Sequence, residues 1–410
     1  FRNLVLALTI KKLQRLKMLF NIDQITQALH HIIIDNSIIE PECNIDKVVI
    51  DSRQAQDACA FIAIKGDNND GNLYAQSALQ QGCSLAIIDN QAIFQELKNR
   101  QQHNVILVQN SFEALYEIAS YQRSQTRAKI IALTGSVGKT TIKDMLKTTF
   151  DNIGATHATT SNLNNHYGLP LTMCNIRKDH DFAILEMGMN HAGEIKPLSE
   201  LAKPDIAIIS KIAMAHIGNF DNEEQIALAK AEIFSGLSDD SIAILNRDDK
   251  FYDFLHHQAL ENGVNATNII NFGYHDTARY KINQIKIKAA SYSEVALQAP
   301  DKIINYGITC SNKTAIFNSA IVAACVDILA PNNLGALDAF NSYQITSGRG
   351  NIIEHEKFTI IDDSYNANLT SCQAGIDYLS DLKQQIKAGR SVAFLGDMLE
   401  LGEFSDQSHQ

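Results

Sequence analysis

Residues 129–141 have the sequence KIIALTGSVGKTT, which is the strongest structural signal in the chain. An apolar strand leads into a turn that contains Gly135 and Gly138, and Lys-Thr-Thr then leads into an amphipathic helix with apolar residues at 142, 145 and 146. Glycines allow backbone N–H groups to approach phosphate oxygens, and a helix N-terminus adds partial positive charge. In this pattern the lysine contacts the β- and γ-phosphates and the following hydroxyl ligates Mg²⁺. The stretch predicts a nucleotide-binding P-loop made by Gly135, Ser136, Gly138, Lys139, Thr140 and Thr141.

One position departs from the strict P-loop pattern. That pattern has a glycine five residues before Gly138, where this chain has Leu133, so Gly135 takes over the turn. The alternative is an ordinary strand-to-helix turn with a surface lysine. The strand before the turn and the helix after it favour nucleotide binding.

Outward from the P-loop, apolar runs rich in Ile and Val alternate with segments of helical period. This alternation predicts an α/β protein with largely parallel sheets, whose ligands bind at the carboxyl ends of strands. The predicted strands are 47–50, 61–64, 84–88, 105–108, 129–134, 182–187, 205–210, 241–246, 357–362 and 391–396. The predicted helices are 112–123, 141–150, 223–237, 315–329 and 371–387.

The chain divides into blocks at changes of pattern. We expect an extension of uncertain origin at 1–17, a small α/β domain at 18–108, a central P-loop domain at 109–332 and an incomplete third domain at 333–410. The first 17 residues place their basic residues after the apolar run, the reverse of a signal peptide. Met18 is a plausible natural start.

Composition excludes several classes of protein. The chain has 410 residues, 35 basic and 46 acidic, so its net charge of −11 disfavours nucleic-acid binding. The apolar runs fall short of the roughly 18 to 20 residues of a membrane span. Seven scattered cysteines without CxxC spacing suggest neither a disulfide framework nor a zinc site, and a reducing cytoplasm is the expected location.

Further candidate residues follow the predicted strands of the central block. Glu186 ends one strand and would hold the metal, and His216 lies just beyond the end of another. On their own, His216 is more often structural and Lys230 is by default a solvated lysine. The polar segment 160–168 suits either turn chemistry or a sugar-bearing ligand.

Together these segments resemble the Mur ligases of peptidoglycan synthesis, and in particular the members that add D-alanyl-D-alanine. The motifs that carry the resemblance are DSR (51–53), FIAIKGDNNDG (61–71), TGSVGKTT (134–141), NLNNHYGLPLT (162–172), EMGMNHAGEI (186–195), AKAEIF (229–234), GRG (348–350), IDDSYNAN (361–368) and LGDMLELGE (395–403). The resemblance implies a three-domain Mur ligase architecture. In it, a small α/β domain binds the UDP-linked substrate, a central P-loop sheet binds ATP, and a truncated Rossmann-like domain helps to bind the dipeptide.

The resemblance also implies roles for matching positions. The residues that match the uridine-nucleotide site are Ser52, Arg53, Lys65 and Gly66. The residues that match the muramoyl-substrate contacts are Asn164 and Asn165. Glu186 and His216 would hold a second magnesium ion, and Lys230 occupies the position of a lysine that relatives carbamylate. Arg349 would approach the γ-phosphate, Asp363 the ribose (with Asp362 as the adjacent alternative), and Asn318 the adenine side.

Some positions depart from the family pattern. The His-Asn-x-x-Asn segment on the adenine side is Thr314-Ala315-Ile316-Phe317-Asn318 here, so only its last Asn remains. Leu369 replaces a proline, Asn72 a histidine and Ser161 a glycine.

The implied reaction is ATP-dependent amide ligation through an acyl phosphate, with ATP and Mg²⁺ as cofactors. Its partners would be UDP-N-acetylmuramoyl-tripeptide and D-alanyl-D-alanine, with neither nucleic acid nor stable membrane insertion, and a monomer is expected. Lys139, His216, Lys230 and Arg349 would be the catalytic residues. The alternatives are another Mur-type or folylpolyglutamate-type amino-acid ligase and a non-catalytic nucleotide-binding module.

Overall fold

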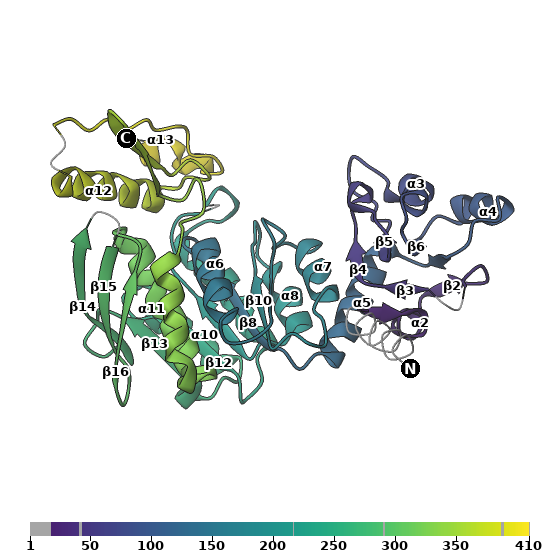
Figure 1. The fold of residues 1–410 in the computed structure, drawn as a ribbon, viewed down its shortest axis with the longest axis horizontal. Coiled ribbons are helices and arrows are strands. Elements are labelled where there is room, and N and C mark those ends of the chain that lie inside the picture. Colours follow the sequence, from purple (N-terminus) through teal and green to yellow (C-terminus); the bar gives the residue numbers. More distant parts are fainter. Residues whose placement is uncertain (1–17, 41–42, 216, 290–291, 387–388, 410) are drawn as a thin grey trace, which may run out of the picture. The chain divides into compact units, whose positions relative to one another are not determined.

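The computed structural model of the chain describes residues 18–40, 43–215, 217–289, 292–386 and 389–409, and it has two compact units (Figure 1). Unit 1 extends to Ala128 and also takes in Thr160–His180. Unit 2 consists of Lys129–Thr159 and the chain from Asp181 onward. The expected extension at 1–17 lies outside the described residues.

Unit 1 is built on a five-stranded sheet in the order β2-β7-β6-β5-β4. Strands β4 to β7 run parallel, and β2 pairs antiparallel with β7 at one edge. A separate antiparallel pair joins β1 and β3. The strands of this unit are β1 (Phe20–Asn21), β2 (Ile33–Asp35), β3 (Asn44–Ile45), β4 (Lys47–Val49), β5 (Cys59–Ile62), β6 (Leu85–Ile88) and β7 (Val105–Val108).

Helices cover this sheet, and asparagine side chains cap the starts of α2, α4 and α5. Asn110 Oδ1 accepts the N–H groups of Phe112 and Glu113, which satisfies the first turn of α5. The buried face of α5 contributes Ala114, Leu115 and residues one turn further on. The helices of unit 1 are α2 (Ile22–Leu29), α3 (Ala75–Gln80), α4 (Gln91–Asn99), α5 (Ser111–Gln125) and α7 (Gly168–Cys174), with short 3₁₀ turns η1 (Ser52–Gln54) and η2 (Gly71–Tyr74).

Unit 2 contains a nine-stranded sheet in the order β16-β15-β14-β13-β12-β11-β8-β10-β9. The strands from β9 to β14 run parallel, and β14, β15 and β16 form an antiparallel meander. Its central strands are apolar because helices bury both faces of a parallel sheet. These strands are β8 (Lys129–Thr134), β9 (Thr156–Ala158), β10 (Phe182–Glu186), β11 (Ile206–Ile209), β12 (Ile242–Asn246), β13 (Ile269–Gly273), β14 (Tyr280–Ala289), β15 (Tyr292–Gln298) and β16 (Ile303–Ile308).

Two helices of unit 2 place the main site. The first, α6, follows β8 directly and packs against α11, and Figure 1 shows them in teal and green. The N-cap of α11 is Asn312, whose Oδ1 accepts the N–H groups of Thr314 and Ala315. The helices of unit 2 are α6 (Lys139–Phe150), α8 (Ile195–Ala202), α9 (Glu223–Ala231), α10 (Tyr252–Glu261), α11 (Lys313–Leu329), α12 (Leu369–Gln385) and α13 (Ser405–His409). Its 3₁₀ segments are η3 (Ile217–Asn219), η4 (Glu232–Gly236), η5 (Ala266–Asn268), η6 (Pro331–Ser342) and η7 (Gly402–Phe404).

The last part of unit 2 corrects one predicted strand. An antiparallel hairpin of β17 (Asn351–His355) and β18 (Phe358–Asp362) precedes α12, but 391–396 is not a strand. Among the described residues no strand pairs with this segment, and Phe394 is 95% exposed. An apolar run becomes a strand only when a neighbouring strand satisfies its N–H and C=O groups.

The predicted helix at 223–237 is also corrected. It is an α-helix only to Ala231 and continues as the 3₁₀ segment η4. The change occurs at Glu232, whose carboxylate accepts N–H groups of Gly193, Ile195 and Lys196 at the start of α8. Apolar spacing does not distinguish these two helix types, because both bury one side.

The cysteine prediction is wrong for one pair. Cys59 in β5 and Cys83 before β6 form a disulfide with a Cα–Cα distance of 4.8 Å. The two residues are 24 positions apart, and the pairing of the two parallel strands brings them together. Sequence spacing could not reveal this proximity.

Candidate functional site

The turn after β8 has the backbone conformation that only glycine adopts without strain. Gly135 has φ +149° and Gly138, the N-cap of α6, has φ +90°. A Cβ at Gly135 would lie 2.0 Å from Ser210 Oγ, and one at Gly138 would lie 2.9 Å from Asn318 Nδ2. The loop is further held by Ser136, whose N–H and Oγ donate to the backbone carbonyls of Lys211 and Ala213. The loop is therefore a preformed cradle of backbone N–H groups at a helix N-terminus, which suits phosphate.

Gly135→Ala is expected to disrupt this cradle. The substitution adds backbone strain of about 1–3 kcal/mol and a contact that Ser210 must move to relieve. We expect a lower melting temperature together with loss of nucleotide binding, measured by thermal unfolding and calorimetric titration with ADP. Gly263→Ala is the matched control, because Gly263 has φ +85° and nothing within 4 Å of the added Cβ. It should cost stability without affecting nucleotide binding, and equal nucleotide affinity in the two variants would contradict the role of Gly135.

The first residues of α6 face the end of the neighbouring strand β10. Lys139 Nζ donates to the carbonyl of Gly135 at 2.7 Å, and Thr140 Oγ1 lies 3.2 and 3.4 Å from the two carboxylate oxygens of Glu186. Glu186 is buried and its N–H donates to Thr159 Oγ1. Because β8 and β10 are parallel neighbours with Glu186 opposite Leu133, their carboxyl ends meet at one edge of the sheet. The predicted pairing of P-loop and acid is therefore present.

A second lysine is buried at the same site. Lys230, on α9, is only 2% exposed. Burial lowers the pKa of Lys230 well below its usual value, and the positive charge of Lys139 lowers it further. Burial also lowers the pKa of Lys139. The negative charge of Glu186 opposes this shift, and the positive charge of Arg349 adds to it. Lys230 is thus a buried amine whose charged form is disfavoured, rather than the solvated lysine that is the default for a helix.

This burial predicts a pH dependence of stability. Between the folded pKa of Lys230 and the usual value of 10.5, the unfolded chain binds a proton that the folded chain does not. The free energy of unfolding therefore rises with pH in that window, by about 1.4 kcal/mol per pH unit. Lys230→Met is expected to remove this slope and to be more stable than the wild type at pH 7. Denaturant unfolding at several pH values in carbonate-free buffer measures both effects. If the free energies of unfolding of the wild type and Lys230→Met changed with pH in parallel, Lys230 would not be the source of the slope.

A pocket beside the P-loop joins four parts of unit 2. It is bounded by the P-loop, the start of α11, the Arg349 turn and the start of α12. Its lining residues are Val137, Gly138, Thr141, Asn312, Thr314, Ala315, Asn318, Gly348, Arg349, Asp363, Asn366, Ser371, Ala374 and Gly375. Thr314 and Ala315, which depart from the family pattern, therefore lie at the predicted nucleotide site.

The turn at 346–350 presents Arg349 to this pocket. Its guanidinium carbon lies 4.0 Å from the centroid of the Tyr365 ring, a cation–π contact. Asp362 holds the turn, since its carboxylate accepts the N–H of Gly348 and the hydroxyls of Ser347 and Ser364. These hydrogen bonds lower the pKa of Asp362, and the bond from the Ser364 hydroxyl has the largest effect. The neighbouring carboxylate of Asp363 lines the pocket, so the structure favours Asp363 over Asp362 as the ligand-facing acid.

The predicted substrate residues lie in unit 1. Ser52 and Arg53 are in η1, where the exposed Arg53 side chain pairs with Asp51 at 2.8 Å. The backbones of Lys65 and Asp70 form an isolated antiparallel β-bridge, and the Gly66 N–H donates to the carbonyl of Asn69. These contacts shape two adjacent surface loops, at the ends of β4 and β5.

The two asparagines of the muramoyl segment also belong to unit 1. Asn165 Oδ1 accepts the N–H groups of Tyr167 and Gly168 at the start of α7, so it has a capping role. The Asn164 N–H donates to the carbonyl of Asn162 within the same turn. Phe112, His166 and Tyr167 form a cluster of aromatic rings beside this segment.

Of the predicted residues, the P-loop, Glu186, Lys230, Asn318, Arg349 and Asp363 come together in unit 2. His216 lies outside the described residues. Sequence reasoning missed Tyr365 and Asn312 as site residues. Asn312 could have been found, because an asparagine directly before a helical pattern is a capping signal. Tyr365 carried no such signal, since its contact with Arg349 depends on the folded turn.

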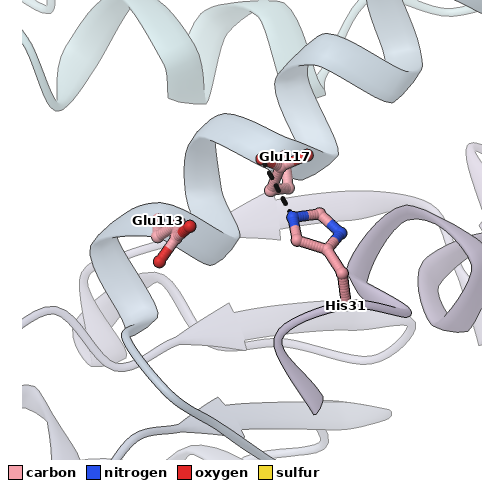
Figure 2. Close-up of side chains that lie close together, drawn as sticks. All are labelled: His31, Glu113 and Glu117. Atoms are coloured by element: carbon pink, nitrogen blue, oxygen red, sulfur yellow. Dashed lines mark ion pairs between the residues drawn. The ribbon is translucent and has the colours of Figure 1, made fainter.

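Unit 1 also contains a small group of possible metal ligands, shown in Figure 2. His31 Nε2 lies 3.4 Å from Glu117 Oε1, and Glu113 is one turn earlier on α5. One ligand atom from each residue lies within 4.8 Å of the others. All three are at least partly exposed, so the arrangement is explained by a surface ion pair with a neighbouring carboxylate.

In the part of the chain that the structure describes, none of the helices combines the length and apolar character that crossing a membrane requires.

Comparison with known proteins gives consistent matches. The family model described as the Mur ligase middle domain matches residues 133–326, and that described as the Mur ligase family, catalytic domain matches residues 44–123. A UDP-N-acetylmuramoyl-tripeptide–D-alanyl-D-alanine ligase of Rickettsia prowazekii is 35% identical over 379 residues, which cover 92% of this chain and 80% of that protein.

Solved structures give the same result. A crystal structure of MurF from Acinetobacter baumannii matches with a TM-score of 0.81 and 29% identity, covering 95% of this chain and 82% of that chain. The structure of MurF ligase from Thermotoga maritima in complex with ADP matches with a TM-score of 0.71 and 25% identity, covering 88% of this chain and 80% of that chain.

Proposed function

This chain belongs to the Mur ligase family, and on that basis we propose that it joins D-alanyl-D-alanine to UDP-N-acetylmuramoyl-tripeptide in peptidoglycan synthesis. The reaction consumes ATP and releases ADP and phosphate. One observation carries the proposal. The P-loop lysine, the buried acid Glu186 and an arginine on a separate turn lie at one site, in a chain 35% identical to a ligase named for this reaction.

The chemistry needs an activated carboxylate, because a free carboxylate resists attack by an amine. An oxygen of the tripeptide's terminal carboxylate attacks the γ-phosphorus of ATP, the bond to the β-phosphate oxygen breaks, and ADP leaves. The product is an acyl phosphate. Lys139 and Arg349 hold and neutralise the phosphoryl oxygens during this transfer, which is mainly a matter of positioning and charge stabilisation.

The second half-reaction forms the amide. The unprotonated amine of D-alanyl-D-alanine attacks the carbonyl carbon of the acyl phosphate. Phosphate then leaves from the tetrahedral intermediate, and the nitrogen loses one proton to become the amide N–H. Exclusion of water from the acyl phosphate is a requirement here, because hydrolysis would consume ATP without forming product.

The donor groups at the site fit magnesium. The Thr140 hydroxyl and the Glu186 carboxylate are hard oxygen donors in adjacent positions, the ligand type that Mg²⁺ prefers. Bound there, Mg²⁺ would neutralise phosphate charge. His216 is proposed as a further ligand from the family resemblance alone.

Lys230 is proposed to be carbamylated. Burial lowers the pKa of its amine and so favours the unprotonated form, which can add to CO₂ to form an N–C bond with release of one proton. The resulting carbamate is an anion beside Lys139 and would supply a further oxygen ligand. This would explain why one lysine is buried next to another.

Unit 1 is proposed to bind the UDP-linked substrate through Ser52, Arg53, Lys65 and Gly66, with Asn164 and Asn165 toward the muramoyl part. The segment after residue 332 is proposed to help bind the dipeptide. We place the reaction in the cytoplasm because it consumes ATP. The cysteines do not support that location, since Cys59 and Cys83 are paired.

The decisive experiment is identification of the product. Purified protein is incubated with ATP, UDP-N-acetylmuramoyl-tripeptide and D-alanyl-D-alanine, and mass spectrometry should detect the pentapeptide with one ADP per amide. Parallel reactions with diaminopimelate, lysine and glutamate test for a different amino-acid ligase. Absence of phosphate release with any substrate pair would indicate a non-catalytic nucleotide-binding module.

A further inference from the structure

A chain of contacts connects the P-loop helix to the turn that carries Arg349. Asp144 lies on α6, which begins at Lys139. Its Oδ2 accepts a hydrogen bond of 2.6 Å from Thr346 Oγ1. The carbonyl of Thr346 in turn accepts the N–H of Arg349 at 3.1 Å, closing the turn. One carboxylate thus joins the helix that begins at the phosphate cradle to the turn that presents the arginine.

Asp144 is partly exposed and Thr346 is exposed, but two residues beside them are buried. Lys143, whose Nζ lies 3.3 Å from Asp144 Oδ1, is only 5% exposed. Tyr343, at the start of the connection into the last part of the chain, is also buried, and its hydroxyl has no hydrogen-bond partner among the described residues. Asp144 thus gives the Thr346 hydroxyl a charged acceptor next to two buried residues.

Asp362 holds the Arg349 turn from its other side. Its carboxylate and carbonyl accept the N–H groups of Gly348 and Gly350. Asp362 belongs to the β17–β18 hairpin that follows the turn, so its bonds move with that hairpin. The bond from Thr346 to Asp144 is different, because Asp144 belongs to the helix of the P-loop.

We propose that Asp144 is a positioning residue that sets where Arg349 stands relative to the phosphate cradle. The inference rests on the proposed ligase function, in which Arg349 acts on the phosphoryl group being transferred. A hydrogen bond to a charged acceptor is stronger and more directional than a neutral one, so it is suited to fixing a turn. Small displacements of a transition-state ligand lower the rate even when ground-state binding persists.

The kinetic test uses Thr346→Val as the main variant. It removes the hydroxyl that donates to Asp144 and leaves the contact between Lys143 and Asp144 intact. Asp144→Ala removes the acceptor, but it also removes the carboxylate that pairs with the buried Lys143. The stability of this variant must therefore be measured too. For both variants kcat should fall about tenfold while the KM for ATP changes less than about threefold. Thr346→Ser and Asp144→Asn, which each keep a hydroxyl or an acceptor oxygen, should retain most of the activity.

Combination with Arg349→Ala separates positioning from general stability. If Asp144 acts through Arg349, then adding Thr346→Val to Arg349→Ala should change kcat by less than about twofold. If the contact only supports the fold, the two losses should multiply. Asp151→Ala is the matched control, because Asp151 lies at the other end of α6 and pairs with Lys147. It should leave kcat unchanged.

A second readout needs no substrate. The chain has no tryptophan, so Tyr365→Trp introduces a single indole beside the Arg349 guanidinium. Adding Thr346→Val should increase quenching of that indole by acrylamide, whereas adding Asp151→Ala should not. Unchanged quenching, or multiplicative kinetic losses, would overturn the positioning role. Absence of ligation by the wild type would refute the proposed function while leaving the quenching result to decide this inference.

Discussion

Lys139→Ala is expected to abolish measurable ADP release while the protein remains folded. Loss of this ammonium removes a group that stabilises the transferring phosphoryl, which costs about 3 kcal/mol or more of transition-state free energy, or at least about 100-fold in kcat. Folding should survive because, among the described residues, Lys139 Nζ donates its hydrogen bond to a backbone carbonyl, that of Gly135. Burial lowers the pKa of Lys139, so the folded state gains little from this charge.

The measurement is a coupled assay of ADP with all three substrates, accompanied by thermal unfolding. Lys147→Ala is the matched control, since Lys147 lies on the same helix in an exposed pair with Asp151. It should retain wild-type turnover. Wild-type turnover in Lys139→Ala would refute the assignment of the P-loop, and loss of folding would show that the lysine is structural.

Lys230→Met is expected to reduce ligation by at least about 100-fold, although it should raise stability at pH 7. The activity falls because a thioether cannot form a carbamate, so the site loses an anionic oxygen ligand near the phosphates. Stability rises because burial disfavours the charged form of this amine, and the variant replaces it with an apolar group of similar length. A residue that costs stability yet is needed for activity is a sign of a functional role.

Carbamylation itself has a direct measurement. Wild-type protein equilibrated with ¹³C-labelled bicarbonate should give a carbamate carbon resonance that is missing in Lys230→Met. Lys230→Arg serves as a second control, because its guanidinium cannot be carbamylated under these conditions. If Lys230→Arg retained activity, or if the wild type gave no carbamate signal while fully active, the modification would be excluded.

The core elements of the sheets were predictable from local sequence. Strands 105–108 and 129–134 were predicted with the observed bounds, and the other predicted strands of the two parallel sheets lie within about two residues of the structure. Continuous apolar runs are required there because helices cover both faces. The meander β14–β16 was missed although its apolar residues alternate, and 391–396 was predicted as a strand although nothing pairs with it. Pairing is a property of two segments, so one segment's composition cannot settle it.

By itself the sequence determined the phosphate cradle and the residue types around it. The GSVGK turn needs glycine at two positions of positive φ, and Glu186 ends a strand beside it, so local rules suffice. The tertiary structure alone decided which groups meet. It buried Lys230 beside Lys139, placed Tyr365 under Arg349 and brought Thr346 to Asp144, a contact between residues 202 positions apart. Burial and long-range contact depend on how the whole chain packs, and no local pattern encodes them.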